Sequence, residues 1–301
     1  MIKNFEELKN KALDSGRMVL SVAAAADETV IAAVEKARKI GIIDVFLVGD
    51  KRKIAAIAEE MGVDIKNYEV IDEEDVTGAA RTAVKLVHDG QADFVMKGIL
   101  GTSDLLKSVL DEEIGLRGKN LLSHIMVYNI PAYHKLLMVT DGGMVISPTM
   151  EEKAGIIQNA VELGRALDIE PLKVAALCAV ETVNPKMQAT VDAKELSEKS
   201  KRGEIEGAIV EGPLAFDLAI SKEAARHKGV AGEVVGDADC LLVPYIEVGN
   251  SIGKCLSYFG GAQCAGIVMG ARKPIVLVSR ADPPEDKFNS IVLGCVIASN
   301  R

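Results

Sequence analysis

The chain has 301 residues, of which 49% are hydrophobic and 26% are charged. These fractions are typical of a folded globular protein and exclude a disordered or collagen-like chain, and at about 150 residues per domain the length predicts two domains or one large α/β domain. The 44 acidic residues outnumber the 35 lysines and arginines, giving a net charge of −9. General binding to nucleic acid or to an anionic membrane is excluded, because it needs a basic footprint. An anionic substrate would need positive charge concentrated in one place.

The cysteines and the N-terminus predict a cytoplasmic protein. The five cysteines have no CxxC spacing and no histidine cluster near them, so neither a zinc site nor a redox dithiol is indicated. Their odd number and apolar neighbours predict free, buried thiols in a reducing compartment. Residues 1–16 form an amphipathic charged segment rather than a signal peptide, and no apolar run approaches the roughly 18 to 20 residues of a membrane span.

Apolar runs alternate with helical patterns along the chain. The predicted strands are residues 18–24, 44–48, 94–96, 173–178, 207–210, 240–243 and 275–278, and the predicted helices are residues 28–39, 51–61, 74–88, 150–167 and 216–227. The runs are continuous rather than alternating, as expected of parallel strands buried on both faces. Three strands follow a glycine that can take the left-handed conformation after a helix, namely Gly41, Gly90 and Gly236. Together these patterns predict βαβ units and a layered α/β fold.

Residues 121–140 depart from this alternation, because they predict two strands joined by a short polar turn with no helix between them. Such a hairpin within a βαβ chain is a candidate domain junction. We expect residues 1–118 plus 272–301 to form one α/β domain and residues 119–271 to form the second. Since no low-complexity linker separates them, we expect close packing with a cleft between the domains.

Several familiar motifs are missing from the sequence. It has no GxxxxGK[ST] loop, no GxGxxG after the first strand, no GxSxG elbow and no HExxH. Nucleotide hydrolysis by a P-loop and an α/β-hydrolase mechanism are therefore disfavoured. The four histidines are scattered, and His88 and His227 lie near helix ends, where they can interact with the helix dipole.

Three strand ends carry small, polar and cationic residues. After the strand at 94–96 comes KGILGTS, in which Lys97 and the glycines precede a helix that Thr102 or Ser103 can cap and that contains Lys107. This pattern is typical of an anion site at a helix N-terminus, although Lys107 is equally well explained as a solvated side chain. After the strand at 240–243, a Gly249-Asn250 turn is expected to lead into a helix that carries Lys254.

The third strand end is the most suggestive. The strand at 275–278 ends in Ser279-Arg280, and a Pro-Pro turn then begins a helix with acids in its first turn. The helix dipole accounts for Glu285 and Asp286. The same spacing can also place a hydroxyl, a guanidinium and a carboxylate at one cleft.

At these residues the sequence resembles the phosphate acetyltransferase/phosphate butyryltransferase family, and most of all its phosphate butyryltransferase branch. The resemblance covers essentially the whole chain and rests on the order and spacing of FVMKG at 94–98, LKSVL at 106–110, VNPKM at 183–187, EGPLA at 211–215, GN at 249–250 and SRAD at 279–282. It implies reversible transfer of a short acyl group, butyryl or acetyl, between coenzyme A and inorganic phosphate. It also implies two three-layer α/β domains with mostly parallel sheets, laid out as in isocitrate and isopropylmalate dehydrogenases, and an interdomain active site.

The resemblance also implies roles for individual residues of this chain. It implies Ser279, Arg280 and Asp286 as catalytic residues, with Asp286 the general base and Asp282 and Glu285 competing for that role. The phosphate or acyl phosphate is expected to contact Lys97, Gly98, Thr102, Lys107 and Arg117, and coenzyme A is expected to contact Gly249, Asn250 and Lys254. Lys107 stands where the family usually has an arginine, so the two parallel hydrogen bonds that a guanidinium can donate to a phosphate are lost. No metal or prosthetic group is expected, and family members are usually dimers or are built from dimers.

Two other functions compete with this one. An oxidative decarboxylase sharing the layout needs a metal site, for which Asp141 and Asp286 are candidates, but no DxxxD helix pattern is present. A non-catalytic protein that binds CoA or acyl phosphate would not need the Ser279-Arg280 pair together with Asp286. Preference between butyryl and acetyl stays open, because one methylene discriminates by only about 1 to 3 kcal/mol.

Overall fold

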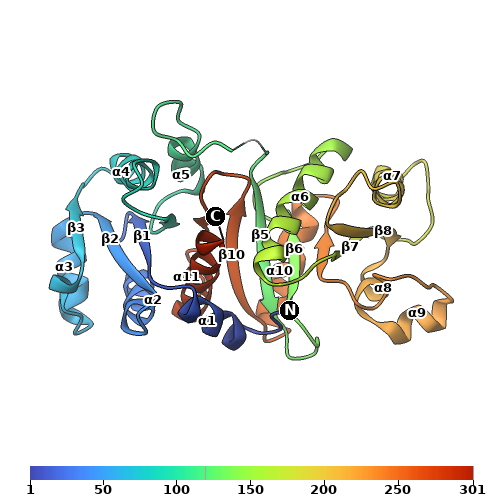
Figure 1. The fold of residues 1–301 in the computed structure, drawn as a ribbon, viewed down its shortest axis with the longest axis horizontal. Helices are drawn as coiled ribbons and strands as arrows, with labels where there is room; N and C mark the ends of the chain where they lie inside the picture. Colours follow the sequence, from blue (N-terminus) through green and yellow to red (C-terminus); the bar gives the residue numbers. More distant parts are fainter. Residues whose placement is uncertain (119, 301) are drawn as a thin grey trace. The chain divides into compact units, whose positions relative to one another are not determined.

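The computed structural model describes residues 1–118 and 120–300, and these residues divide into two compact units. Unit I comprises Phe5–Lys119 and Ala265–Arg301, and unit II comprises Met1–Asn4 and Asn120–Cys264. Each unit has its own strands and covering helices (Figure 1). The predicted domain boundary at residue 119 lies outside the described residues, and the second division falls after Cys264, within β10.

The sheet of unit I has the strand order β3-β2-β1-β4-β11-β10. In that order the strands are Glu69–Asp72, Ile43–Gly49, Met18–Ala23, Phe94–Lys97, Ile275–Val276 and Gln263–Met269. All neighbours are parallel except β10 and β11. Every residue of β4 and the last four of β1 are buried, which explains their unbroken apolar sequences.

Helices cover both faces of this sheet. They are α1 (Phe5–Asp14), α2 (Glu28–Lys39), α3 (Lys51–Glu60), α4 (Val76–His88), α5 (Thr102–Val109) and α11 (Pro284–Ser299), with a short 3-10 turn at Ile65–Asn67. Helix α11 packs between α1 and α2, whereas α4 packs on α5 against the opposite face (Figure 1). Helix α11 is buried from Asp286 to Ala298 and is the central helix of the unit.

The sheet of unit II has the order β5-β6-β9-β7-β8. Its strands are Ser123–Asn129, Leu137–Thr140, Cys240–Leu242, Leu172–Leu177 and Ala208–Leu214. Only the β5–β6 hairpin is antiparallel within this order. Helices α6 (Met150–Ala166) and α7 (Gln188–Lys201) pack on each other, and α8 (Phe216–Ile220), α9 (Lys222–Lys228) and α10 (Ile246–Tyr258) contribute to one apolar cluster with the strands.

The predicted fold class is confirmed, and so are the main elements. Helix α2 has the predicted bounds, the hairpin at 121–140 is present, and Gly41, Gly90 and Gly236 all have positive φ. One predicted helix is wrong, because residues 216–227 form two helices rather than one. Ser221 interrupts them, and its hydroxyl accepts a hydrogen bond from Ala224 N as the cap of α9.

The cysteine prediction is partly wrong. Cys240, Cys264 and Cys295 are buried, but Cys178 is half-buried and Cys255 is exposed. Cys255 lies on α10, whose buried positions are glycines, so its side chain is on the outer surface of the helix. Among the described residues, no helix has both the length and the apolar character needed to cross a membrane, and no group of three potential ligands is arranged for a metal ion.

Candidate active site

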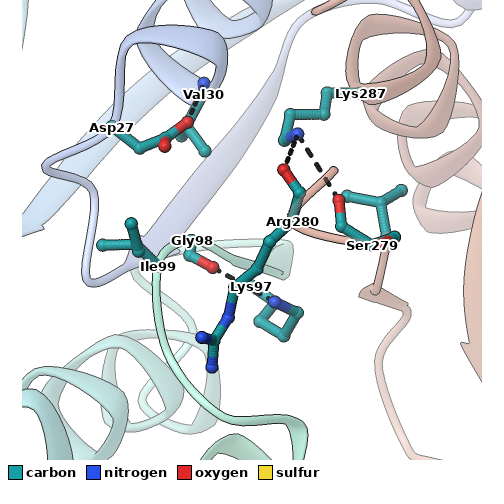
Figure 2. A pocket seen from close by; sticks show the side chains of 9 residues that line it. Asp27, Val30, Lys97, Gly98, Ile99, Ser279, Arg280 and Lys287 are labelled. Carbon is teal, nitrogen blue, oxygen red and sulfur yellow. Dashed lines mark hydrogen bonds between the residues drawn. The ribbon is translucent and has the colours of Figure 1, made fainter. Parts of the chain in front are cut away.

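A pocket lies in unit I where three neighbouring parallel strands end (Figure 2). Strands β1, β4 and β11 are adjacent, so the segments that follow them meet at one edge of the sheet. The lining residues are Asp27 and Val30 after β1, Lys97, Gly98 and Ile99 at the end of β4, Val278, Ser279 and Arg280 after β11, and Lys287 on α11. The structure therefore brings together four predicted site residues, Lys97, Gly98, Ser279 and Arg280.

Gly98 lets the segment after β4 lie directly against the end of β1. Gly98 N donates to Ala23 O at 2.8 Å, and Ile99 N donates to Ala24 O at 2.9 Å. A Cβ at position 98 would lie 2.2 Å from Ala24 O and 2.5 Å from Ala23 O. Only glycine permits this approach, which fixes the backbone beside Lys97.

Positive charge is concentrated in the pocket. Lys97 is 4% exposed, and its Nζ donates to Gly98 O at 3.2 Å and to Leu100 O at 3.3 Å. Burial lowers the pKa of Lys97, and the nearby charges of Arg280 and Lys287 lower it further. Burial also lowers the pKa of Lys287. Within residues 1–118 and 120–300 neither lysine forms an ion pair, so both charges remain available to attract an anion.

Ser279 and Arg280 lie on an exposed turn between β11 and α11. The turn is closed by Asp282, whose Oδ2 accepts from Ser279 N at 2.8 Å and whose N donates to Ser279 O at 3.2 Å. The Arg280 guanidinium extends from this turn and makes no hydrogen bond within the part of the chain that the structure describes. The turn thus presents one hydroxyl and one free guanidinium beside the two buried lysines.

Asp27 and Lys287 line the pocket although the sequence did not single them out. Asp27 precedes α2 and caps it, because its Oδ1 accepts from Val30 N at 3.0 Å. The signal that could have found Asp27 is an aspartate at the end of a predicted strand and one residue before a predicted helix. No local signal marks Lys287. With three cations and one carboxylate, the pocket is suited to a ligand with more than one negative charge.

Three predicted phosphate contacts do not line this pocket. Lys107 is exposed on α5 and is 3.6 Å from Asp104, and Arg117 is exposed with its Nε donating to Leu110 O at 2.8 Å. Thr102 is the first residue of α5, but the predicted cap is wrong. The cap residue is Gly101, and no side chain bonds there.

The three acids considered for the role of general base, Asp282, Glu285 and Asp286, have different surroundings. Asp286 is 7% exposed in the first turn of α11 and is not among the pocket-lining residues. Glu285 pairs with Lys36 at 2.5 Å, and Asp282 accepts from Ser279 N. The carboxylates of Asp282 and Glu285 are therefore engaged in structural contacts. The role of Asp286 as a base stays a prediction.

The predicted CoA contacts belong to unit II. Gly249, Asn250 and Lys254 lie on α10, which begins at Ile246, so the predicted Gly249-Asn250 turn before the helix is wrong. Gly249 is required for packing, because a Cβ there would lie 2.7 Å from Gly142 Cα. Asn250 Nδ2 donates to Gly142 O at 3.4 Å, and Lys254 is exposed.

Comparison with known proteins identifies the family. The family model described as phosphate acetyl/butaryl transferase matches residues 73–295. A phosphate butyryltransferase of Clostridium acetobutylicum is 46% identical over all of both chains, and a phosphate acetyltransferase of Thermotoga maritima is 42% identical over 97% of this chain and 99% of its own. The crystal structure of a branched-chain phosphotransacylase from Enterococcus faecalis superposes with a TM-score of 0.84 and 35% identity, covering 93% of this chain and 99% of that one. The chain with its cationic pocket is therefore an acyltransferase that belongs to the phosphate acetyl/butaryl transferase family.

Proposed function

We propose that the protein transfers a short acyl group reversibly between coenzyme A and inorganic phosphate. The observation that carries this proposal is the pocket that Lys97, Arg280 and Lys287 line together with Ser279. Phosphate and acyl phosphate each carry about two negative charges, which this surplus of cations would stabilise. Coenzyme A is a substrate here, and the chemistry that we propose requires neither a prosthetic group nor a metal.

The transfer proceeds directly within a ternary complex. A phosphate oxygen attacks the thioester carbonyl, a carbon–oxygen bond forms, the carbon–sulfur bond breaks, and coenzyme A leaves as a thiolate that takes up a proton. Arg280 stabilises the phosphate and the developing carbonyl oxyanion, and Ser279 donates a hydrogen bond to the transition state. No histidine is among the pocket-lining residues to activate Ser279 as a nucleophile, so no acyl-enzyme is needed.

Asp286 is the proposed base in the reverse direction, where it receives the thiol proton. The reference pKa values of a thiol and an aspartate, about 8.5 and about 3.9, differ by roughly 6 kcal/mol in free energy. The proton transfer therefore has to be concerted with attack, or has to be driven by stabilisation of the thiolate by a cation.

Butyryl is the proposed acyl group, because the chain resembles the butyryltransferase branch and is 46% and 43% identical to two proteins named phosphate butyryltransferase. Acetyl is the second candidate, since a phosphate acetyltransferase is 42% identical. We further propose that the enzyme acts in the cytoplasm, in butanoate metabolism, as a homo-oligomer built from dimers. The expected placement of Lys107, Arg117 and Thr102 at phosphate, and of Gly249, Asn250 and Lys254 at coenzyme A, belongs to this proposal.

Release of thiol from butyryl-CoA upon addition of phosphate, followed with a thiol reagent, tests the proposal. We expect phosphate-dependent release, and rates with acetyl-, propionyl-, butyryl- and isobutyryl-CoA give the chain-length preference. Failure to release thiol from any of these would overturn the proposed activity and favour a non-catalytic binding protein. Ping-pong kinetics, or a trapped acyl group on Ser279, would overturn the direct mechanism alone.

A further inference from the structure

The turn that carries Ser279 and Arg280 has little regular structure to hold it. Strand β11 ends at Val276 and α11 begins at Pro284, so the turn lies between two elements without belonging to either. Ser279, Arg280 and Ala281 are exposed. A turn that must orient a hydroxyl and a guanidinium toward one reacting centre needs an anchor from the packed part of the unit.

Lys287 supplies contacts from inside the unit to three successive parts of this turn. It lies one turn into α11 and is 3% exposed. Its Nζ donates to Asp282 O at 2.6 Å. It also donates to Arg280 O at 3.4 Å and to Ser279 O at 3.5 Å (Figure 2). Three carbonyl oxygens match the three N–H donors of an ammonium group, whereas a neutral amine has only two.

Lys287 differs in its surroundings from two other buried lysines and resembles a third, Lys97, which also donates to backbone carbonyls and has no ion pair among the described residues. Lys135 and Lys153 are about as buried as Lys287, but each pairs with an aspartate, at 2.5 and 2.6 Å. Lys287 forms no ion pair within residues 1–118 and 120–300 and has carbonyl oxygens of the turn as its hydrogen-bond acceptors. A buried charge without a counter-ion destabilises the fold, so its presence is better explained by the geometry that it imposes on the turn than by stability.

We propose that Lys287 is a positioning residue for the acyl transfer: its ammonium group holds the Ser279–Asp282 turn by three backbone carbonyls and thereby orients Ser279 and Arg280. The inference rests on the proposed function, since the orientation matters only if these two side chains act on the reacting groups. Lys287 acts through the turn and does not itself need to contact the phosphate.

Chemical rescue of Lys287→Ala tests this inference, and the wild-type protein is assayed first. The exchange removes three methylenes and the ammonium, so n-propylammonium matches the missing part. Because a misplacement of about 1 Å can lower the rate about 100-fold, we expect kcat for phosphate-dependent thiol release to fall by about that factor. We expect n-propylammonium to restore kcat saturably, and methylammonium or 1-propanol to restore it poorly.

Two further variants serve as controls. Lys36→Ala removes an ammonium that contacts α11 through Glu285 and the Phe288 ring and that makes no hydrogen bond to the turn among the described residues, so kcat should stay near the wild-type value. Arg280→Ala should lose kcat without recovery in n-propylammonium, which excludes an effect of the amine elsewhere. Lys287→Met fills the space of the lysine side chain but has no hydrogen-bond donor, and it is used if Lys287→Ala does not fold. Lys287→Met should lose kcat while keeping the circular dichroism spectrum of the wild-type protein.

The outcomes separate this inference from the proposed function. An inactive wild-type protein overturns the proposed function, and this inference with it. An active wild-type protein with normal kcat in Lys287→Met overturns the inference alone. So does a folded, inactive Lys287→Ala that n-propylammonium does not rescue or that 1-propanol rescues equally well. Loss of folding in both variants would show that Lys287 stabilises the unit rather than positions the turn.

Discussion

Substitution of Gly98 by alanine changes the pocket without removing any charged group. Gly98 follows Lys97 directly, and its backbone N donates to Ala23 O at 2.8 Å. The added methyl would lie 2.2 Å from Ala24 O and 2.5 Å from Ala23 O. Both are backbone atoms at the end of β1, so no side-chain rotation can relieve the contact.

The size of the effect follows from these distances. An ordinary contact between a Cβ and an oxygen is about 3.2 Å or longer, so the two backbones must separate by about 1 Å. Overpacking of this kind destabilises a protein by about 1 to 3 kcal/mol. The displacement moves Lys97 and Ile99 relative to the end of β1, and a misplacement of about 1 Å is expected to lower kcat about 100-fold.

Gly101→Ala is the matched control in the same segment. Gly101 has φ −66° and ψ 141°, which alanine adopts without strain. Its Cβ would lie 2.7 Å from Asp104 Oδ2, the end of a side chain that is 39% exposed and can rotate away, and at an ordinary contact distance of 3.5 Å from Ser103 Oγ. Thiol release from butyryl-CoA and thermal unfolding are measured for both variants. Near-normal kcat in Gly98→Ala, or an equal loss in Gly101→Ala, would refute the steric argument.

Three further substitutions test individual cations. Arg280→Ala should lower phosphate-dependent thiol release by about 100- to 1,000-fold. Its unfolding curve should be unchanged, because the exposed guanidinium has no hydrogen bond to lose in the described part of the chain. Normal turnover would remove Arg280 from the mechanism. For Lys97, whose pKa is lowered by burial in the folded state, wild-type stability relative to Lys97→Met should increase as the pH rises through the folded pKa towards the unfolded value near 10.5. Denaturant unfolding at several pH values measures this difference, and a flat or opposite trend contradicts it. Lys107→Ala should raise the KM for phosphate. It should change the free energy of unfolding by less than about 0.5 kcal/mol, because Lys107 is exposed and its one ion pair, from Nζ to Asp104 Oδ1 at 3.6 Å, is a long contact at the surface. An unchanged KM would place Lys107 outside the phosphate site.

The sequence predicted elements well where local chemistry decides them. Helix α2 has the predicted bounds because Asp27 caps its first turn and a continuous buried face follows. Positive φ at Gly41, Gly90 and Gly236 follows from their place after a helix. Buried strands such as β4 were visible because all of their residues face the core.

Predictions failed where tertiary packing overrides the local pattern. Helix α10 begins at Ile246, before the expected Gly249-Asn250 turn, because Gly249 is needed for its close approach to Gly142 rather than for a turn. Thr102 is a good cap by residue type, but Gly101 occupies the cap position. Neither the approach to Gly142 nor the exact start of a helix is encoded in a few neighbouring residues.

The composition of the pocket depends on strand order, which no local pattern contains. Lys97 and Ser279-Arg280 were recognised because each follows an apolar run, but their meeting requires β11 to lie beside β4 in the sheet. Lys287 could not be assigned for the same reason. It lies within a helix that is buried on nearly all sides, and only the folded turn shows which carbonyls surround its ammonium.

The net charge of −9 and the cationic pocket are compatible because charge acts locally. At an ionic strength of about 0.15 M, exposed charges are screened beyond about 8 Å, so acidic residues elsewhere on the surface contribute little at the pocket. Lys97 and Lys287 are buried and therefore screened less by salt, and Asp27 is the one carboxylate among the residues that line the pocket. Burial lowers the pKa of both lysines, which means that their positive charge is held at the expense of stability. A dianion bound beside them would offset that cost by supplying a counter-charge. Local positive charge from these two lysines is therefore compatible with the net negative charge of the protein.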